Sequence, residues 1–228
     1  MKDINYNDLD IFQDLNNSHK SETISEFMEY LCLCNNVSVN VKTHVKKEII
    51  KGHEDEGEII SENSFTEKKF NSSVAEERAL LKTLKYFGFS IDKVNQKEIT
   101  INIDGKSKVY YILGRNRYTE SKKPSDMTRN RMSVILRAHK HEKESILLCK
   151  GNDLSIMEKL KITETKSEKF IQTMIEQIQI MANNGLRYFI FCKKKLNEQE
   201  TNEFLSKYKL AENYVLQKEI LFENVNNE

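Results

Sequence analysis

The stretch TRNRMSVILRAHKHEKESILLCKGND, residues 128–153, decides the fold class of this chain. Two runs within it, residues 131–137 and 144–149, are rich in apolar residues, and the polar turn His139-Lys140-His141 separates them. Short apolar runs bounded by polar turn residues are typical of β-strands. The stretch therefore predicts two neighbouring strands that run antiparallel.

More strands are expected on either side. Residues 98–103 alternate apolar with polar side chains, Asp104-Gly105 supplies a two-residue turn, and residues 108–113 return. Residues 187–193 predict a further strand, and residues 37–41 alternate too briefly to predict more than a short one. These hairpins favour an antiparallel sheet.

Helical spacing of apolar residues marks four other segments. They are residues 24–37, 74–87, 167–183 and 198–208. Gly88 and Gly185 follow the second and third of them as stop signals. In the second helix, the residues expected to face inward are Ala79, Leu80, Thr83, Leu84 and Phe87. Hairpins combined with separate helices predict an α+β fold, an antiparallel β-sheet flanked by helices.

The 228 residues fit one domain, and we interpret residues 1–228 as a single domain. Residues 44–71 are charged and low in complexity, with His-Glu-Asp-Glu-Gly-Glu at 53–58. No helical or strand periodicity is evident there, so we expect a mobile insertion at about residues 44–71.

Composition excludes several classes of function. Lys and Arg number 36 against 35 Asp and Glu, a net charge of +1, so the broad positive field typical of nucleic-acid binders is missing. No apolar run approaches the roughly 20 residues that span a bilayer, and the polar N-terminus is unlike a signal peptide. The four cysteines lack metal-ligand spacing, which favours a reduced cytosolic environment and no metal site. A soluble monomer is expected.

Common catalytic motifs are also missing. Gly105-Lys106-Ser107 ends like a phosphate-binding loop, but the position five residues before Gly105 is Thr100, not glycine. No GxSxG sequence occurs, so no catalytic residue is assigned.

An ordered set of short motifs carries the functional information. It comprises VAEERALL at 74–81, Gly-Phe at 88–89, TRNRMSV at 128–134, LCKGND at 148–153 and NGLR at 184–187. The set resembles the nucleotide-binding (N) domain of type IV P-type ATPases, the phospholipid flippases. Members of that family carry SPDEAALV, Gly-Phe, FNSTRKRMSV, KGAD and EGLRT in the same order. LCLCNNV at 31–37 and LNEQE at 196–200 also resemble the family's LALCHTV and LSEEE segments, so the resemblance covers about residues 24–218.

The resemblance implies a nucleotide site. It implies that Glu77 accepts a hydrogen bond from the adenine amino group, and that Arg131 belongs to the same site. Lys150 and Gly151 end a predicted strand, where a glycine allows a ligand to approach the backbone and the lysine offers a cation. Arg187 brings a planar guanidinium suited to phosphate oxygens. The alternative is that Glu77 is a solvated residue of the first helical turn and that Arg187 is a surface cation.

One departure from the family concerns the aromatic residue that stacks on adenine. Counting back from TRNRMSV without a gap places Ser125 at that position, and serine has no aromatic face. Counting forward from residues 110–113 places Tyr118 there, with a polar insertion at about residues 119–126. We prefer Tyr118, because it keeps an aromatic surface for the base; with Ser125, nucleotide binding is weakened or lost.

The resemblance implies an ATP-binding domain that positions the γ-phosphate for transfer to an aspartate on a separate domain. The expected ligands are ATP and Mg²⁺, the latter shared with the parent's phosphorylation domain, and the expected partners are the parent's phosphorylation and actuator domains. The family's DKTGT loop is missing, so we expect a fragment that is not an enzyme by itself, from a membrane protein with this part in the cytosol. Two alternatives stay open: a degenerate, regulatory ATPase-like module, for example of a protist guanylyl cyclase fusion, and an unrelated α+β binding domain.

Overall fold

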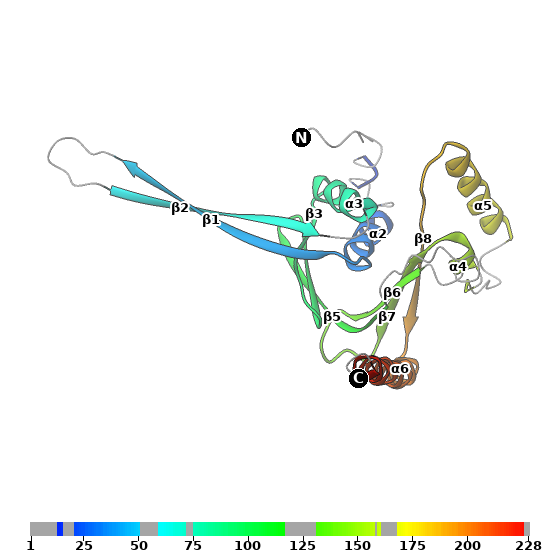
Figure 1. The fold of residues 1–228 in the computed structure, drawn as a ribbon. Coiled ribbons are helices and arrows are strands. Elements are labelled where there is room, and N and C mark those ends of the chain that lie inside the picture. Colours follow the sequence, from blue (N-terminus) through cyan, green and yellow to red (C-terminus); the bar gives the residue numbers. More distant parts are fainter. Residues whose placement is uncertain are drawn as a thin grey trace.

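A computed structural model describes residues 13–15, 21–50, 59–71, 75–116, 131–157, 159–160 and 168–225. Its centre is a six-stranded sheet in which every strand is hydrogen-bonded, antiparallel, to the next strand along the chain (Figure 1). The strands are β3 (Phe89–Val94), β4 (Glu98–Ile103), β5 (Lys106–Asn116), β6 (Arg131–Arg137), β7 (Ser145–Gly151) and β8 (Ile190–Leu196). The predicted α+β class, an antiparallel sheet with flanking helices, is confirmed.

The predicted strands β4 to β7 are present, but the prediction missed β3 and placed β8 three residues too early. In β3 the register with β4 shifts between Ile91 and Lys93. A bulge of this kind breaks the two-residue alternation by which a strand is recognised. Phe89 and Ile91 alternate as expected and are both buried, whereas Val94, beyond the bulge, is out of phase with them.

The turn between β4 and β5 has the expected two residues. Asp104 and Gly105 both have positive φ, 48° and 83°. Two successive residues in the left-handed region form the turn type that matches the twist of a hairpin. This turn also touches the end of α3, since the Asp104 amide donates a hydrogen bond to the Gly88 carbonyl (3.0 Å).

Helices α2 (Ser21–Leu33) and α3 (Ala75–Tyr86) pack beside β3 and β4. Their buried residues form one core with the inward side chains of the sheet. That core includes Leu31, Leu33, Leu81, Leu84, Phe87, Ile91, Ile99, Ile101, Met132, Val134, Leu136 and Leu148. On α3 the prediction of Ala79 as an inward residue was wrong, because Ala79 is exposed and Leu81 is buried instead.

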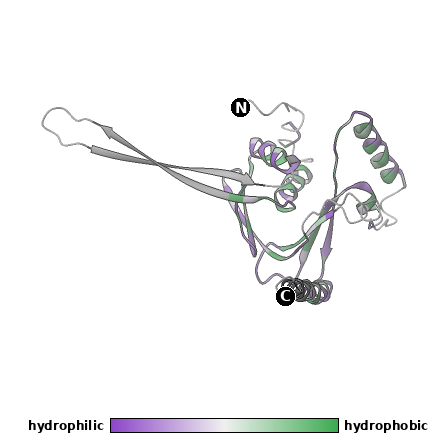
Figure 2. Ribbon diagram, in the orientation of Figure 1, coloured by the Kyte–Doolittle hydropathy of each residue, from purple (hydrophilic) through white to green (hydrophobic). Residues whose placement is uncertain are grey.

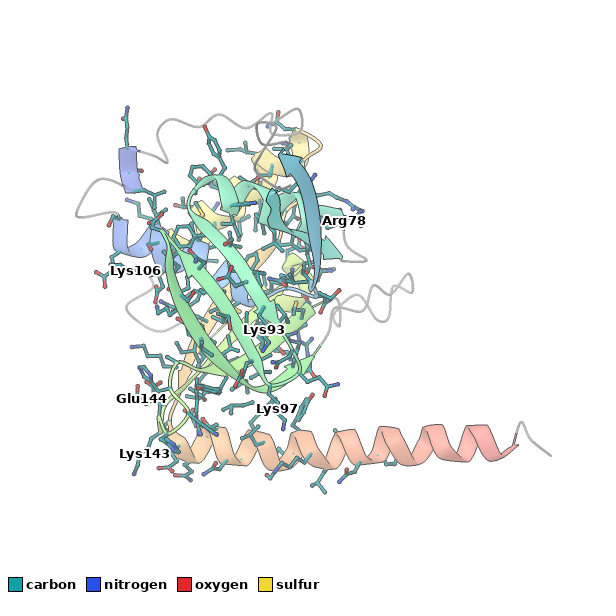
Figure 3. The ribbon with its side chains drawn as sticks, turned by 90° about the vertical axis from the view of Figure 1, so that its left-hand side faces the viewer. Arg78, Lys93, Lys97, Lys106, Lys143 and Glu144 are labelled. Carbon is teal, nitrogen blue, oxygen red and sulfur yellow. The ribbon has the colours of Figure 1, made fainter. Side chains whose placement is uncertain are left out.

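Two further helices contact the later strands. The short helix α4 (Asp153–Met157), which was not predicted, directly follows β7 and buries Ile156. Helix α6 (Glu198–Val225) is much longer than predicted and runs past the sheet (Figure 3). It approaches β5 at Gly114, where a Cβ atom would lie 3.5 Å from the ring of Phe204. The charged side chains labelled in Figure 3, from α3, the strand ends and the turns, are exposed.

The segment expected to be a mobile insertion, at about residues 44–71, was predicted to lack strand periodicity, but it contributes to two strands of a β-hairpin. Strands β1 (Ser38–Ile50) and β2 (Ile59–Asn71) pair antiparallel along their whole length and extend away from the rest of the chain (Figure 1). The register places Lys42 opposite Glu67 and Lys47 opposite Glu62. Residues of opposite charge placed across two strands are compatible with a hairpin, so a high density of charged residues does not by itself indicate irregular structure.

Helix α5 (Glu168–Asn183) has nearly the predicted bounds, and Gly185 follows it with φ 69°. It lies on the opposite side of the sheet from the hairpin, and much of its length is hydrophobic (Figure 2). Phe170 and Ile180 are each about half exposed.

Candidate functional site

One end of the sheet gathers the residues that the sequence singled out. The register places Arg131, Gly151 and Ile190 side by side, at the start of β6, the end of β7 and the start of β8. Strand β5 ends at the same place, since Asn116 pairs with Ser133. The first turn of α3, which carries Glu76 and Glu77, contacts this end through two ion pairs.

The first ion pair joins Lys150 to Glu77 in the interior. The Nζ atom of Lys150 donates to Oε1 of Glu77, and the two side chains are 4% and 2% exposed. The backbone amide of Asn36 also donates to both carboxylate oxygens, at 3.2 and 3.1 Å. Glu77 is therefore not a solvated residue of a helical turn. Lys150 ends up buried, rather than presented to solvent as a free cation.

Lys150 has an aromatic neighbour that sequence reasoning missed. Its Nζ atom lies 5.7 Å from the centre of the Phe189 ring, within the range of a cation–π contact. Phe189 belongs to the segment between α5 and β8 and is partly exposed. Two residues after NGLR, it is an aromatic residue that the motif itself could have indicated.

The second ion pair joins Arg187 to Glu76 at the surface. Arg187 Nη1 donates to Oε1 of Glu76, and the arginine side chain is 77% exposed. The backbone N–H of Glu76, in the first turn of α3, and then the Arg187 guanidinium lower the pKa of Glu76. Arg187 lies three residues before β8 instead of within a strand. Its partner Glu76 directly precedes Glu77 in α3, so the two ion pairs are neighbours.

An unsatisfied acceptor completes this group. The side-chain oxygen of Asn36 is buried and has no hydrogen-bond partner among the described residues. The backbone N–H of the same residue donates to Glu77. A buried polar atom without a partner is unfavourable unless a ligand or water completes it. Asn36 lies in the LCLCNNV segment, but nothing in the sequence distinguished it from Asn35. The side chain of Asn35 instead caps α2 by donating to the carbonyls of Leu31 and Cys32.

Arg131 is separated from Lys150. Successive residues of a strand point to opposite faces, and Met132, opposite Lys150 in the register, points into the core. Arg131 thus lies on the other face, where its charge acts on Cys149. Gly151 is buried at the end of β7. Tyr118 and Ser125 lie outside the described residues. They belong to the connection between Asn116 and Arg131, and these two flanking residues lie at this end of the sheet.

Two further properties concern metals and membranes. The described residues contain no group of three or more His, Cys, Asp or Glu side chains arranged to hold a metal ion. Within the same part of the chain, no helix is both long and apolar enough to cross a membrane.

Comparison with known proteins decides the family. Residues 23–226 match the family described as P-type ATPase, cytoplasmic domain N. The chain belongs to this family of N domains. The resemblance to the N domain of type IV P-type ATPases is thereby confirmed.

Relatives of this N domain are of two kinds. It is 30% identical to phospholipid-transporting ATPase IC of Homo sapiens over 62% of the chain and 10% of that protein. The corresponding protein of Xenopus tropicalis is 28% identical over 84% of the chain and 13% of its own length. Guanylate cyclase beta of Plasmodium berghei is 26% identical over 89% of the chain and 7% of that protein. The chain thus spans about a tenth of the length of these relatives.

Proposed function

We propose that this N domain binds ATP at the end of the sheet where Glu77 and Lys150 meet. As part of a longer phospholipid-translocating P-type ATPase, it would position the γ-phosphate for transfer to an aspartate on another domain. The observation that carries the proposal is the buried acceptor pair of Glu77 and Asn36 beside Lys150. The names of the ATPase relatives support the wider assignment.

The acceptor pair suits the adenine base. The exocyclic amino group of adenine has two N–H donors, and a carboxylate and an amide oxygen are acceptors. The backbone N–H of Asn36 donates to the Glu77 carboxylate, so the carboxylate and the side-chain oxygen of Asn36 are held close together. Guanine has a carbonyl oxygen where adenine has its amino group. The arrangement therefore favours adenine over guanine.

The neighbouring residues suit the remainder of the nucleotide. The ammonium of Lys150 and the partly exposed ring of Phe189 provide a cation and an aromatic surface close to the acceptors. Arg187 is exposed and has a planar fork that suits phosphate oxygens. Gly151 allows close approach of a ligand to the backbone. In this proposal Tyr118, rather than Ser125, stacks on the base. Arg131 lies on the other face of the sheet, so its contribution would be limited to the phosphates.

Catalysis would depend on the other parts of the parent protein. The described residues do not fit a metal ion, so Mg²⁺ would be held by the phosphates and by the parent's phosphorylation domain. This chain would contribute binding and orientation, which accelerate phosphoryl transfer by positioning. Its partners would be the phosphorylation and actuator domains, and its place the cytosolic side of the parent's membrane.

The test is a titration of the ¹⁵N-labelled chain followed by NMR. We expect ATP to bind with a Kd of about 1 mM, equivalent to about −4 kcal/mol, since half of the parent's site is present. Signals of Asn36, Lys150 and Phe189 should move, and GTP should bind several-fold more weakly than ATP. Asn36→Ala should weaken ATP binding without changing GTP binding, and Asn202→Ala, on an exposed residue of α6, should change neither. Equal responses to ATP and GTP would refute adenine recognition.

A second function is favoured by the ion pair itself. The carboxylate of Glu77 is already paired with the ammonium of Lys150, which leaves this cation less available to a nucleotide. The match to guanylate cyclase beta also covers 89% of the chain. A regulatory module that keeps the fold without binding nucleotide would have these properties. No shift near Lys150 at several millimolar ATP, with the chain folded, would favour this function over the first.

A further inference from the structure

Two cysteines face each other across the last two strands of the sheet. Cys149 in β7 and Cys192 in β8 are direct partners in the register. Opposite residues of antiparallel strands have their Cα atoms about 4.5 or 5.5 Å apart and their side chains on one face. Disulfides form at Cα separations of about 4.4–6.8 Å. The backbone therefore already holds these residues at a distance that a disulfide can bridge.

The two thiols also interact directly. They lie opposite each other on the same face of neighbouring strands, and both residues are partly exposed. The neighbouring Cys149 thiol lowers the pKa of Cys192 to about 7, against the effect of burial. For the same reason the pKa of Cys149 is raised, although the Arg131 charge opposes the rise. Since the thiolate is the nucleophile, Cys192 is the more reactive of the two.

The chain contains a comparison pair with opposite properties. Cys32 and Cys34 are buried in the core, and burial raises the pKa of each to about 12. Buried thiols in apolar surroundings are inert. Reactivity should thus be confined to the pair on β7 and β8.

We propose that Cys149 and Cys192 are a reversible oxidation site that reacts with low-molecular-weight disulfides such as glutathione disulfide. The Cys192 thiolate attacks one sulfur of glutathione disulfide, whose S–S bond breaks and releases one glutathione thiolate. Cys149 then loses its proton to solvent, attacks Cys192 Sγ in the mixed disulfide and displaces the second glutathione. Two protein thiols are oxidised to one disulfide, and one glutathione disulfide is reduced to two thiols.

The experiment treats the folded 228-residue chain with buffered mixtures of reduced and oxidised glutathione. Remaining thiols are then alkylated, and the peptides are mapped by mass spectrometry. We expect a Cys149–Cys192 cross-link, seen as the loss of two hydrogen atoms, that dithiothreitol reverses. Cys149→Ser should stop at a stable glutathione adduct on Cys192, and Cys192→Ser should form no intramolecular cross-link. Cys34→Ser, the matched control, should form the cross-link like the unaltered chain.

Several results would overturn the proposal. Among them are a pair of thiols that stays unmodified at oxidising ratios of glutathione, a glutathione adduct that persists on the unaltered chain, and a cross-link that involves Cys34 instead of Cys149. Circular dichroism in parallel ensures that the chain reacts while folded, and a cross-link formed only in urea would also count against it. None of these readouts depends on nucleotide binding.

Discussion

The ammonium group of Lys150 and the carboxylate of Glu77 form an ion pair inside the protein, with neither side chain more than 4% exposed. It connects the first turn of α3 to the end of β7 across 73 residues of sequence. Two charges removed from water stabilise a fold only while each has the other. The pair is therefore a sensitive point of the structure as well as the centre of the candidate site.

Glu77→Gln should destabilise the domain strongly, because it leaves the Lys150 ammonium buried without a counter-charge. We expect a loss of about 3–5 kcal/mol in the free energy of unfolding, measured by urea denaturation. The double variant Glu77→Gln/Lys150→Met should recover most of that loss. Glu76→Gln removes the exposed pair with Arg187 and should cost less than about 1 kcal/mol. Equal losses for Glu76→Gln and Glu77→Gln would contradict the burial of the inner pair.

Gly88→Ala should lower the melting temperature. Gly88 has φ 85°, and an added Cβ would overlap the carboxylate of Asp104 in the β4–β5 turn. Gly105 has a similar φ of 83°, but nothing lies within 4 Å of its Cβ position. Gly105→Ala therefore carries the backbone strain without the overlap, and it should be the milder change in thermal denaturation. A larger fall in melting temperature for Gly105→Ala than for Gly88→Ala would show that the end of α3 does not contact the β4–β5 turn.

Shortening the β1–β2 hairpin should leave the domain nearly as stable as before. Replacing residues 42–67 by Asn-Gly keeps the base of the hairpin, including Val39, which packs against the core. We expect the melting temperature to change by less than about 3 °C, equivalent to about 1 kcal/mol for a domain of this size. Val39→Asp, which alters the retained base, should lower it clearly. A loss of several degrees on shortening would show that the outer hairpin contributes to the core.

Assigning the base-stacking position to Tyr118 or to Ser125 leads to different predictions for ATP binding. Tyr118→Ala should weaken ATP binding about tenfold or more, because an aromatic face contributes about 1–3 kcal/mol to a stacked base. Ser125→Ala should have little effect, and Ser125→Phe should not improve binding. Calorimetry distinguishes the two assignments. A large gain with Ser125→Phe, together with no effect of Tyr118→Ala, would favour the regulatory function.

Alkylation of Cys192 should follow pH with a midpoint near 7. Its pKa is lowered to about 7, so the reactive thiolate forms as the pH rises through that value, whereas an ordinary cysteine has a pKa of about 8.5. Cys149→Ala removes the neighbouring thiol that lowers the pKa of Cys192, and the midpoint should rise. The measurement is the rate of iodoacetamide labelling between pH 5.5 and 9.5, roughly spanning both values. A midpoint that does not move would show that the two thiols do not interact.

The sequence predicted those parts of the fold where local pattern and tertiary structure agree. The bounds of β4 and β6 and the turn Asp104-Gly105 followed directly from alternation and turn residues. The hairpin was missed because its sequence is rich in charged residues, with Lys42 in register opposite Glu67, and shows no clear apolar alternation of the kind by which a half-buried strand is recognised. Strand β3 was missed because its bulge interrupts the alternation.

The candidate site was predictable as a set of residues but not as an arrangement. The motif order indicated Glu77, Lys150 and Arg187, and the structure brings all three to one end of the sheet. Pairing across 73 and 111 residues leaves no local signal in the sequence, so neither ion pair was foreseen. The separation of Arg131 from Lys150 depends on strand register, which no motif encodes.

The sequential order of the six strands also has a consequence for how the domain is made. Each strand pairs with its neighbour in the chain, so the sheet can grow from local hairpins, a topology that favours rapid folding. The two ion pairs of the candidate site are long-range contacts instead, because α3 precedes the sheet, whereas Lys150 lies near the end of its fifth strand and Arg187 lies three residues before its sixth. A molecule that binds across these pairs recognises only the finished domain and stabilises it at the expense of every partly folded form. Its binding would report that synthesis and folding of the domain are complete.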